Sequence, residues 1–306
     1  MSNPYFSNDP YFGESEKARK QRASLGVPAV PQAGQQQGYG QPGAYGQQAY
    51  GTPSGTQTLP PVPGADQLEN SYRMPAASAA QTGRMTYDDV IMKTGLVLGT
   101  IVVFGAFSWW APVALGMPGL QAGLMIIGLI GGLVLGLVNS FKREPSPALI
   151  LAYGAFQGLF MGAISSVFEA RYPGIVVQAV LATVATFTAV LLLFKSGKVR
   201  NTTKFQRIVM VSLVGYMIFS LVNLVLMLTG VLDGWGLRQG PLGILIGVAA
   251  VILAAATLVI DFDGIQKGVL RGAPARYAWS AAFGLAVTLV WMYLEFLRLL
   301  AILRGD

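Results

Sequence analysis

Residues 120–140 decide the fold, because they read LQAGLMIIGLIGGLVLGLVNS and include no charged side chain. A helix of about 20 residues rises about 30 Å, which is the thickness of the hydrocarbon core of a bilayer. Apolar side chains surround this helix on every side, whereas a soluble bundle needs only one apolar stripe. They do not alternate with polar side chains, as those of a membrane β-strand do. The stretch therefore predicts a transmembrane α-helix.

Six further apolar runs of similar length accompany this one, so the predicted fold class is an all-α polytopic membrane protein with seven transmembrane helices. The other runs are residues 92–111, 148–168, 174–194, 208–229, 242–262 and 278–300. Proline and glycine separate the runs, at Pro112, Pro145 and Gly272 among other positions. Residues 86–306 are thus predicted to form one transmembrane domain.

Residues 1–85 have a different composition and are predicted to be a disordered tail. Gln, Gly, Pro and Tyr are abundant there, and no charged residue lies between Arg22 and Asp66. Such a segment buries too little apolar surface to offset the entropy of ordering. It also lacks the apolar run of a secretory signal. Its repeated motifs, residues 3–6 and 9–12, are either docking sites for a protein partner or a chance similarity.

The first transmembrane helix is predicted to begin next to Thr86. Thr86 and Asp89 are three residues apart and resemble a capping box, in which each side chain accepts a hydrogen bond from the backbone N–H of the other residue. Acidic residues in the first turn, here Asp88 and Asp89, also interact favourably with the helix dipole.

The distribution of lysine and arginine predicts how the chain is oriented in a cell membrane. Twelve basic residues fall in one set of connections and adjoining span ends, and four fall in the other set. By the positive-inside rule the first set faces the cytoplasm, so the tail is inside and the C-terminus, after seven spans, is outside. The formal charge of +7 thus forms a cytoplasmic rim that favours anionic lipid headgroups, and it predicts no nucleic-acid partner.

The composition excludes most catalytic centres. The chain has no cysteine and no histidine, so it has no disulfide, no zinc site built on these ligands and no histidine-based triad. Its glycine-rich runs lie inside apolar spans and lack the Gly-Lys-Ser/Thr sequence of a phosphate-binding loop. We therefore expect a protein that is not an enzyme and that uses no cofactor.

Two spans carry glycine at every fourth position, which places each series on one helix face. Such a face admits a neighbouring backbone, either within the chain or across a homodimer. The series are Gly128, Gly132 and Gly136 in the second span and Gly154, Gly158 and Gly162 in the third.

Ionisable residues inside the spans are few, and such residues are costly unless they are paired or hydrated. Asp261 and Asp263 close the sixth span, where one faces a pore or both lie in the headgroup zone beside basic residues. Glu295 in the seventh span either pairs with Arg298, three residues later on the same side, or faces a cavity as a proton-sensitive carboxylate. The neutral polar candidates for a pore lining are Gln157 and Asn223.

Three motifs carry a resemblance to a known family. They are AFQGLFMG at residues 155–162, IDFDGI at residues 260–265 and YLEF at residues 293–296. Together with the seven spans and the basic connection between the second and third, they resemble the Bax inhibitor-1 family, including its bacterial YccA-like branch, over residues 86–306. The resemblance implies a fold of six helices around a central seventh helix.

Some members of that family are proton-sensitive calcium leak channels. The resemblance therefore implies calcium as a permeant ion and a pH gate made of two acids and one base. The acids carried over are Glu295 and Asp261, with Asp263 as a rival, and the base is Lys142 or Arg143. The resemblance to YccA-like relatives also implies an alternative function, a non-conducting adaptor or regulator of a membrane-bound protease in a stress response.

The two acids of the implied gate are 34 residues apart, which constrains any site that they share. If the chain turns at residues 272–274, Asp261 lies about 17 Å from the turn and Glu295 about 31 Å, at about 1.5 Å per residue. They meet only if much of residues 264–279 is a loop or if one helix is broken.

Overall fold

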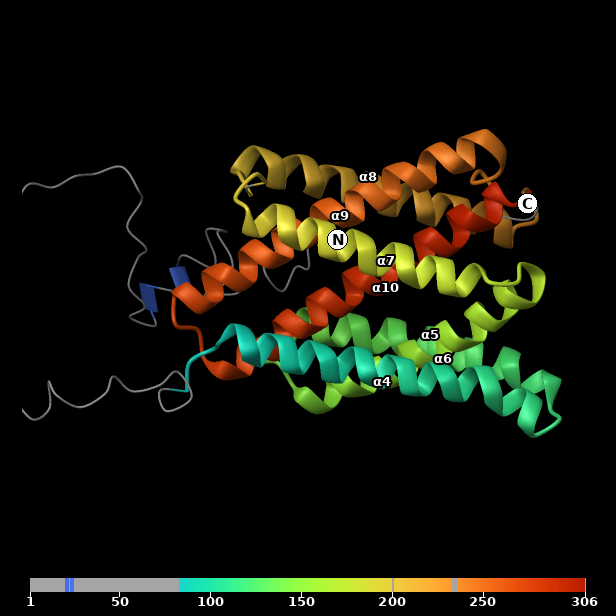
Figure 1. The fold of residues 1–306 in the computed structure, drawn as a ribbon, viewed down its shortest axis with the longest axis horizontal. Helices are drawn as coiled ribbons and strands as arrows, with labels where there is room; N and C mark the ends of the chain where they lie inside the picture. The colour runs from blue at the N-terminus through green and yellow to red at the C-terminus, as the bar shows by residue number, and fades with distance from the viewer. Residues whose placement is uncertain (1–19, 22, 25–82, 200, 233–235, 306) are drawn as a thin grey trace, which may run out of the picture. The chain divides into compact units, whose positions relative to one another are not determined.

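In the computed structural model, most of the predicted tail lies outside the described residues. The described residues are 20–21, 23–24, 83–199, 201–232 and 236–305. In this part, seven helices are long and apolar enough to cross a membrane, and no β-sheet is present (Figure 1). They are α4 (Tyr87–Ala114), α5 (Pro118–Phe141), α6 (Pro147–Arg171), α7 (Ile175–Lys195), α8 (Thr203–Leu228), α9 (Gly240–Leu270) and α10 (Ala278–Leu303). The predicted all-α fold with seven membrane-spanning helices is confirmed.

Local sequence signals explain where several of these helices begin. The Asp89 N–H donates to Thr86 Oγ1 at 3.0 Å, and the Thr86 N–H donates to Asp89 Oδ2 at 3.1 Å. The predicted capping box at the start of α4 is therefore confirmed. Proline occupies the first turn of α5, α6 and α9, where its fixed backbone angle suits a helix and its missing N–H costs nothing.

Helix α10 is the central helix and the most deeply buried of the seven (Figure 1). α4, α6, α7 and α9 pack directly against it, whereas α5 packs mainly on α6 and α8 mainly on α9. This arrangement agrees with the expected six helices around a central last helix. The polar residues of α10 are consequently removed from lipid by the helices around them.

The glycine series pack helices together within the chain. Gly154, Gly158 and Gly162 of α6 face α4, and a Cβ atom at Gly162 would lie only 2.0 Å from the carbonyl oxygen of Gly105. On the other side of α6, a Cβ atom at Gly128 of α5 would lie 2.4 Å from the backbone nitrogen of Phe160. Both helix pairs therefore depend on the absence of a side chain, which confirms the intramolecular alternative.

Helix α9 is longer than the sequence predicts, since it continues eight residues past Phe262 to Leu270. An ion pair between Asp263 and Lys267, one turn apart at 2.9 Å, supports this extension. The helix stops before Gly272, whose φ of 65° is accessible mainly to glycine. In the same way α4 continues through Pro112, where the sequence predicts a break.

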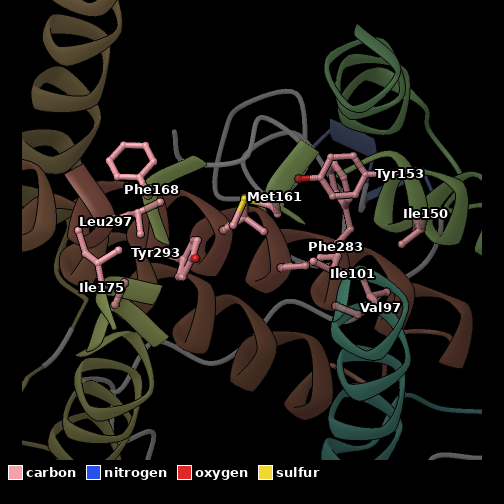
Figure 2. Close-up of a cluster of buried hydrophobic side chains, with 14 of the residues drawn as sticks. Val97, Ile101, Ile150, Tyr153, Met161, Phe168, Ile175, Phe283, Tyr293 and Leu297 are labelled. Atoms are coloured by element: carbon pink, nitrogen blue, oxygen red, sulfur yellow. The ribbon is translucent and has the colours of Figure 1, made fainter. Parts of the chain in front are cut away.

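Large side chains fill the core on the side of α10 that faces α4, α6 and α7 (Figure 2). The Phe283 and Tyr153 rings meet edge to face with centroids 5.0 Å apart. Farther toward the C-terminus of α10, the hydroxyl groups of Tyr293 and Ser165 share a hydrogen bond of 2.7 Å. Residues on this side are more than 100° away around α10 from Thr288 and Glu295, which face α9 and α8. Helix α10 therefore has a mostly apolar face and a polar face.

Candidate functional site

The polar face of α10 consists of Thr288, Trp291, Glu295 and Arg298. They follow one another at intervals of three or four residues, so they lie along one side of the helix. Thr288 contacts α9 through Asp261, and Glu295 contacts α8 through Tyr216. The face is therefore enclosed by α8 and α9, and it brings together ionisable residues that are far apart in the sequence.

Asp261 is buried between α9 and α10 with an exposed fraction of 2%. The Thr288 hydroxyl donates a hydrogen bond of 2.8 Å to its Oδ2 atom. Among the residues that the structure describes, no basic side chain forms an ion pair with it. A buried carboxylate with a single neutral partner is costly when ionised, because its charge is neither hydrated nor paired.

Asp263 has different surroundings, although it is only two residues away. Its Oδ2 atom lies 2.9 Å from the ammonium group of Lys267 and accepts a hydrogen bond of 2.8 Å from the side-chain amide of Asn201. Positions two apart point about 200° apart on a helix, so the two acids face different neighbours. The headgroup-zone hypothesis, with an acid balanced by a lysine, thus fits Asp263 and does not fit Asp261.

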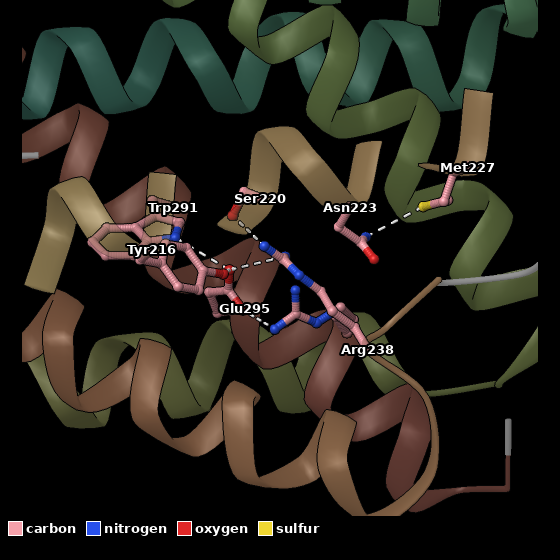
Figure 3. A network of polar contacts seen from close by, with 8 residues as sticks. Tyr216, Ser220, Asn223, Met227, Arg238, Trp291 and Glu295 are labelled. Atoms are coloured by element: carbon pink, nitrogen blue, oxygen red, sulfur yellow. Dashed lines mark hydrogen bonds and ion pairs between the residues drawn. The ribbon is translucent and has the colours of Figure 1, made fainter. Parts of the chain in front are cut away.

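Glu295 is the centre of a buried polar cluster in the C-terminal half of α10 (Figure 3). Arg298 donates to its Oε2 atom, in the ion pair that a spacing of three residues predicts. The Tyr216 hydroxyl and the Trp291 ring N–H, the latter at 3.2 Å, both donate to Oε1. Glu295 is therefore paired and hydrogen-bonded, as the ion-pair alternative predicts.

Arg238 is a further member of this cluster that the sequence analysis missed. It precedes α9, and its guanidinium group lies 4.0 Å from Glu295 Oε1. The same group lies over the rings of Tyr216 and Phe219, at 5.0 and 5.3 Å, and donates to the Ser220 hydroxyl (Figure 3). Burial lowers the pKa of Arg238 from its ordinary value, but arginine is so basic that the group stays charged.

The structure does not bring Asp261 and Glu295 together. Asp261 is level with Thr288, and Glu295 lies seven residues farther along α10, a rise of about 10.5 Å. The loop that would allow them to meet is absent, since α9 is continuous as far as Leu270. The two acids therefore occupy successive levels of one polar face, and they do not share a proton here.

The proposed basic partners lie elsewhere. Lys142 and Arg143 follow the end of α5 and are exposed. The bases that contact Glu295 are instead Arg298 and Arg238. A contact between distant segments, such as that of Arg238, has no signature in local spacing, and the only hint was an arginine four residues before a predicted span.

The two neutral polar candidates have packing roles. Asn223 of α8 accepts a hydrogen bond of 2.6 Å from the Leu237 N–H, which holds the segment before α9 against α8. Gln157 lies between α5 and α6, where a Cβ atom at Gly132 would be 2.7 Å from its Oε1 atom. In the described part of the chain, no three acidic residues are grouped closely enough to hold a metal ion.

A family model described as Bax inhibitor 1 like matches residues 3–305. The chain belongs to this family. The match extends beyond the resemblance over residues 86–306 and includes nearly all of the N-terminal tail. No curated protein and no solved structure matches the chain.

Proposed function

We propose that this Bax inhibitor-like membrane protein is a proton-sensitive cation leak, with calcium as a permeant ion, and that its pathway follows the polar face of α10. One observation carries the proposal: Asp261 is buried beside this face with Thr288 as its hydrogen-bond partner, and no described basic side chain forms an ion pair with it. An ionisable group inside a membrane bundle is costly and marks a functional site by default.

The proton controls the pathway through the charge of Asp261. When the carboxyl group is protonated, its hydrogen bond with Thr288 joins α9 to α10 and the pathway stays closed. When it is ionised, a negative charge that no described basic side chain pairs with lies between two packed helices, which favours the entry of water and of a cation. We therefore expect flux to rise as the pH rises.

Two acids at successive levels replace the shared pair that the resemblance implies. Asp261 and Glu295 each supply carboxylate oxygens, which are the ligands that calcium prefers. Their separation of about 10.5 Å along α10 lets a cation move from one level to the next without both acids binding it at once. Glu295 can accept a cation only after its ion pair with Arg298 breaks.

The full-length protein, reconstituted in liposomes with a trapped calcium dye, tests the proposal between pH 6 and pH 8. We expect faster calcium movement at pH 8 than at pH 6. D261N, which mimics the protonated acid, should stay slow at both pH values. D88N is the matched control, because Asp88 is an exposed acid in the first turn of α4.

Two results would overturn the proposal. One is the absence of calcium movement in the wild-type protein at every pH, and the other is an unchanged pH dependence in D261N. The alternative of a non-conducting adaptor depends on residues 1–85, most of which lie outside the described part of the chain. A wild-type protein without calcium movement would favour that alternative.

A further inference from the structure

The buried cluster around Glu295 carries an excess positive charge. Glu295 contributes one negative charge, whereas Arg298 and Arg238 contribute two positive charges. All three side chains are removed from water, with exposed fractions of 6%, 7% and 13%. No second acid contacts either arginine in the part of the chain that the structure describes. The described ionised side chains of the cluster therefore sum to a charge of +1.

Arg238 supplies the excess charge from outside the helices. Glu295 and Arg298 are one turn apart on α10 and would form a neutral pair without it. Arg238 instead enters from the segment before α9, where the bond between Asn223 and the Leu237 N–H anchors the neighbouring backbone. Two aromatic rings and the Ser220 hydroxyl hold its guanidinium group in place. Its position is thus specified by several contacts besides the acid.

The cluster lies well inside the bundle, not at its surface. Glu295 is eight residues before the end of α10 at Leu303, which corresponds to a depth of about 12 Å. Any cation that follows the polar face of α10 to this end of the bundle must pass close to Arg238. By the distribution of basic residues, this end is predicted to face away from the cytoplasm.

A buried positive charge opposes cations strongly at this depth. At an effective dielectric constant of about 20, a unit charge about 8 Å away lowers the occupancy by a monovalent cation roughly 30-fold. The penalty for a divalent cation is the square of this factor, because its charge is doubled. Fixed positive groups exclude cations from membrane pores in the same manner.

We infer that Arg238 is an electropositive plug that restricts cations, and divalent cations most, at the end of the polar face of α10. This inference rests on the proposed function for its physiological meaning. The charge of the cluster itself can be tested without any assumption about flux.

The first test measures calcium movement at pH 8 in the same liposomes. R238M removes the charge, keeps an apolar side chain between the rings and leaves Glu295 paired with Arg298. We expect it to raise the rate at least tenfold, while R238K, which keeps the charge, stays within twofold of the wild-type rate. R304M is the matched control, because Arg304 is an exposed arginine at the same end of the bundle. If R238M and R304M have equal rates, the inference is wrong.

The second test uses the absence of cysteine in the chain. S220C places one thiol beside Arg238, and it is labelled by methanethiosulfonate reagents of similar size, one anionic and one cationic. We expect the ratio of the anionic to the cationic labelling rate to fall at least tenfold when R238M is added, with R238Q as a second variant. Any change in the reactivity of the thiol itself affects both reagents and cancels in the ratio.

The two tests separate failure of the inference from failure of the proposed function. An unchanged labelling ratio contradicts the inference, and so does a thiol that neither reagent reaches with or without Arg238. A wild-type protein without calcium movement but with a labelling ratio that depends on Arg238 contradicts the proposed function alone. Movement that depends on pH, with a rate that R238M does not change, contradicts the inference alone.

Discussion

Replacement of Gly162 by alanine is the most direct test of the close packing between α4 and α6. The added Cβ atom would lie 2.0 Å from the carbonyl oxygen of Gly105, and 2.7 and 2.8 Å from its carbonyl carbon and Cα. All three atoms belong to the α4 backbone, so no side-chain rotation can relieve the contact. Carbon atoms in favourable contact are about 3.5 Å or more apart. The two carbon contacts fall short of this limit by about 0.8 and 0.7 Å, so helices α4 and α6 must separate locally by at least about 0.8 Å.

The cost can be estimated from two opposing effects. Overpacking of a well-packed interior costs about 1–3 kcal/mol, and a clash between two backbones belongs at the upper end. Alanine in place of glycine inside a helix returns up to about 1 kcal/mol. We expect a net loss of about 2 kcal/mol in the free energy of unfolding. In a domain of this size such a loss lowers the Tm by about 4–8 °C.

The assay is the Tm of the purified protein in mild detergent, followed by intrinsic fluorescence and by loss of the monodisperse peak in gel filtration. Gly99→Ala is the matched control on α4, because a Cβ atom at Gly99 meets nothing within 4 Å. Both variants gain the same helix propensity, so their difference reports the contact with Gly105. A Gly162→Ala protein as stable as Gly99→Ala would refute the close approach of α4 and α6.

Three further changes probe the ends of the helices and the polar cluster. Thr86→Ala removes the capping box of α4 and should cost about 1 kcal/mol, visible as a lower Tm, whereas Thr86→Ser should retain it. Glu169→Ala removes the acceptor for the N–H groups before and within the first turn of α7, at 2.6 and 3.1 Å, and should also cost about 1 kcal/mol by thermal unfolding. Arg298→Met breaks the buried pair with Glu295 and should cost about 3 kcal/mol, and a Tm equal to that of the wild type would show that Arg238 alone suffices.

Some of the site follows from the sequence because neighbours on one helix have a fixed geometry. The spacing of three residues places Arg298 beside Glu295, and the same regularity predicts the capping box between Thr86 and Asp89. The partner of Asp261 could not be found in this way. Thr288 is 27 residues away on another helix, and the contact depends on the register in which α9 packs along α10.

The length of α9 shows how a local signal can be outweighed. The run of apolar residues ends at Phe262, and the charges that follow predict the end of the helix. Because Asp263 and Lys267 are one turn apart, they pair and the helix continues to Leu270. That continuation separates Asp261 from Glu295 and rules out the shared acid pair in this conformation.

By itself the sequence determined that this chain is an α-helical membrane protein with seven spans, since the length and polarity of each run are matched to a bilayer. The glycine series also specified that helices approach closely, although not which ones. Only the tertiary structure decided that Arg238 joins Glu295 and that Asp261 lacks a counter-ion among the described residues. These contacts depend on the rotation and register of packed helices, and rotation and register are set by side-chain fit across the whole bundle.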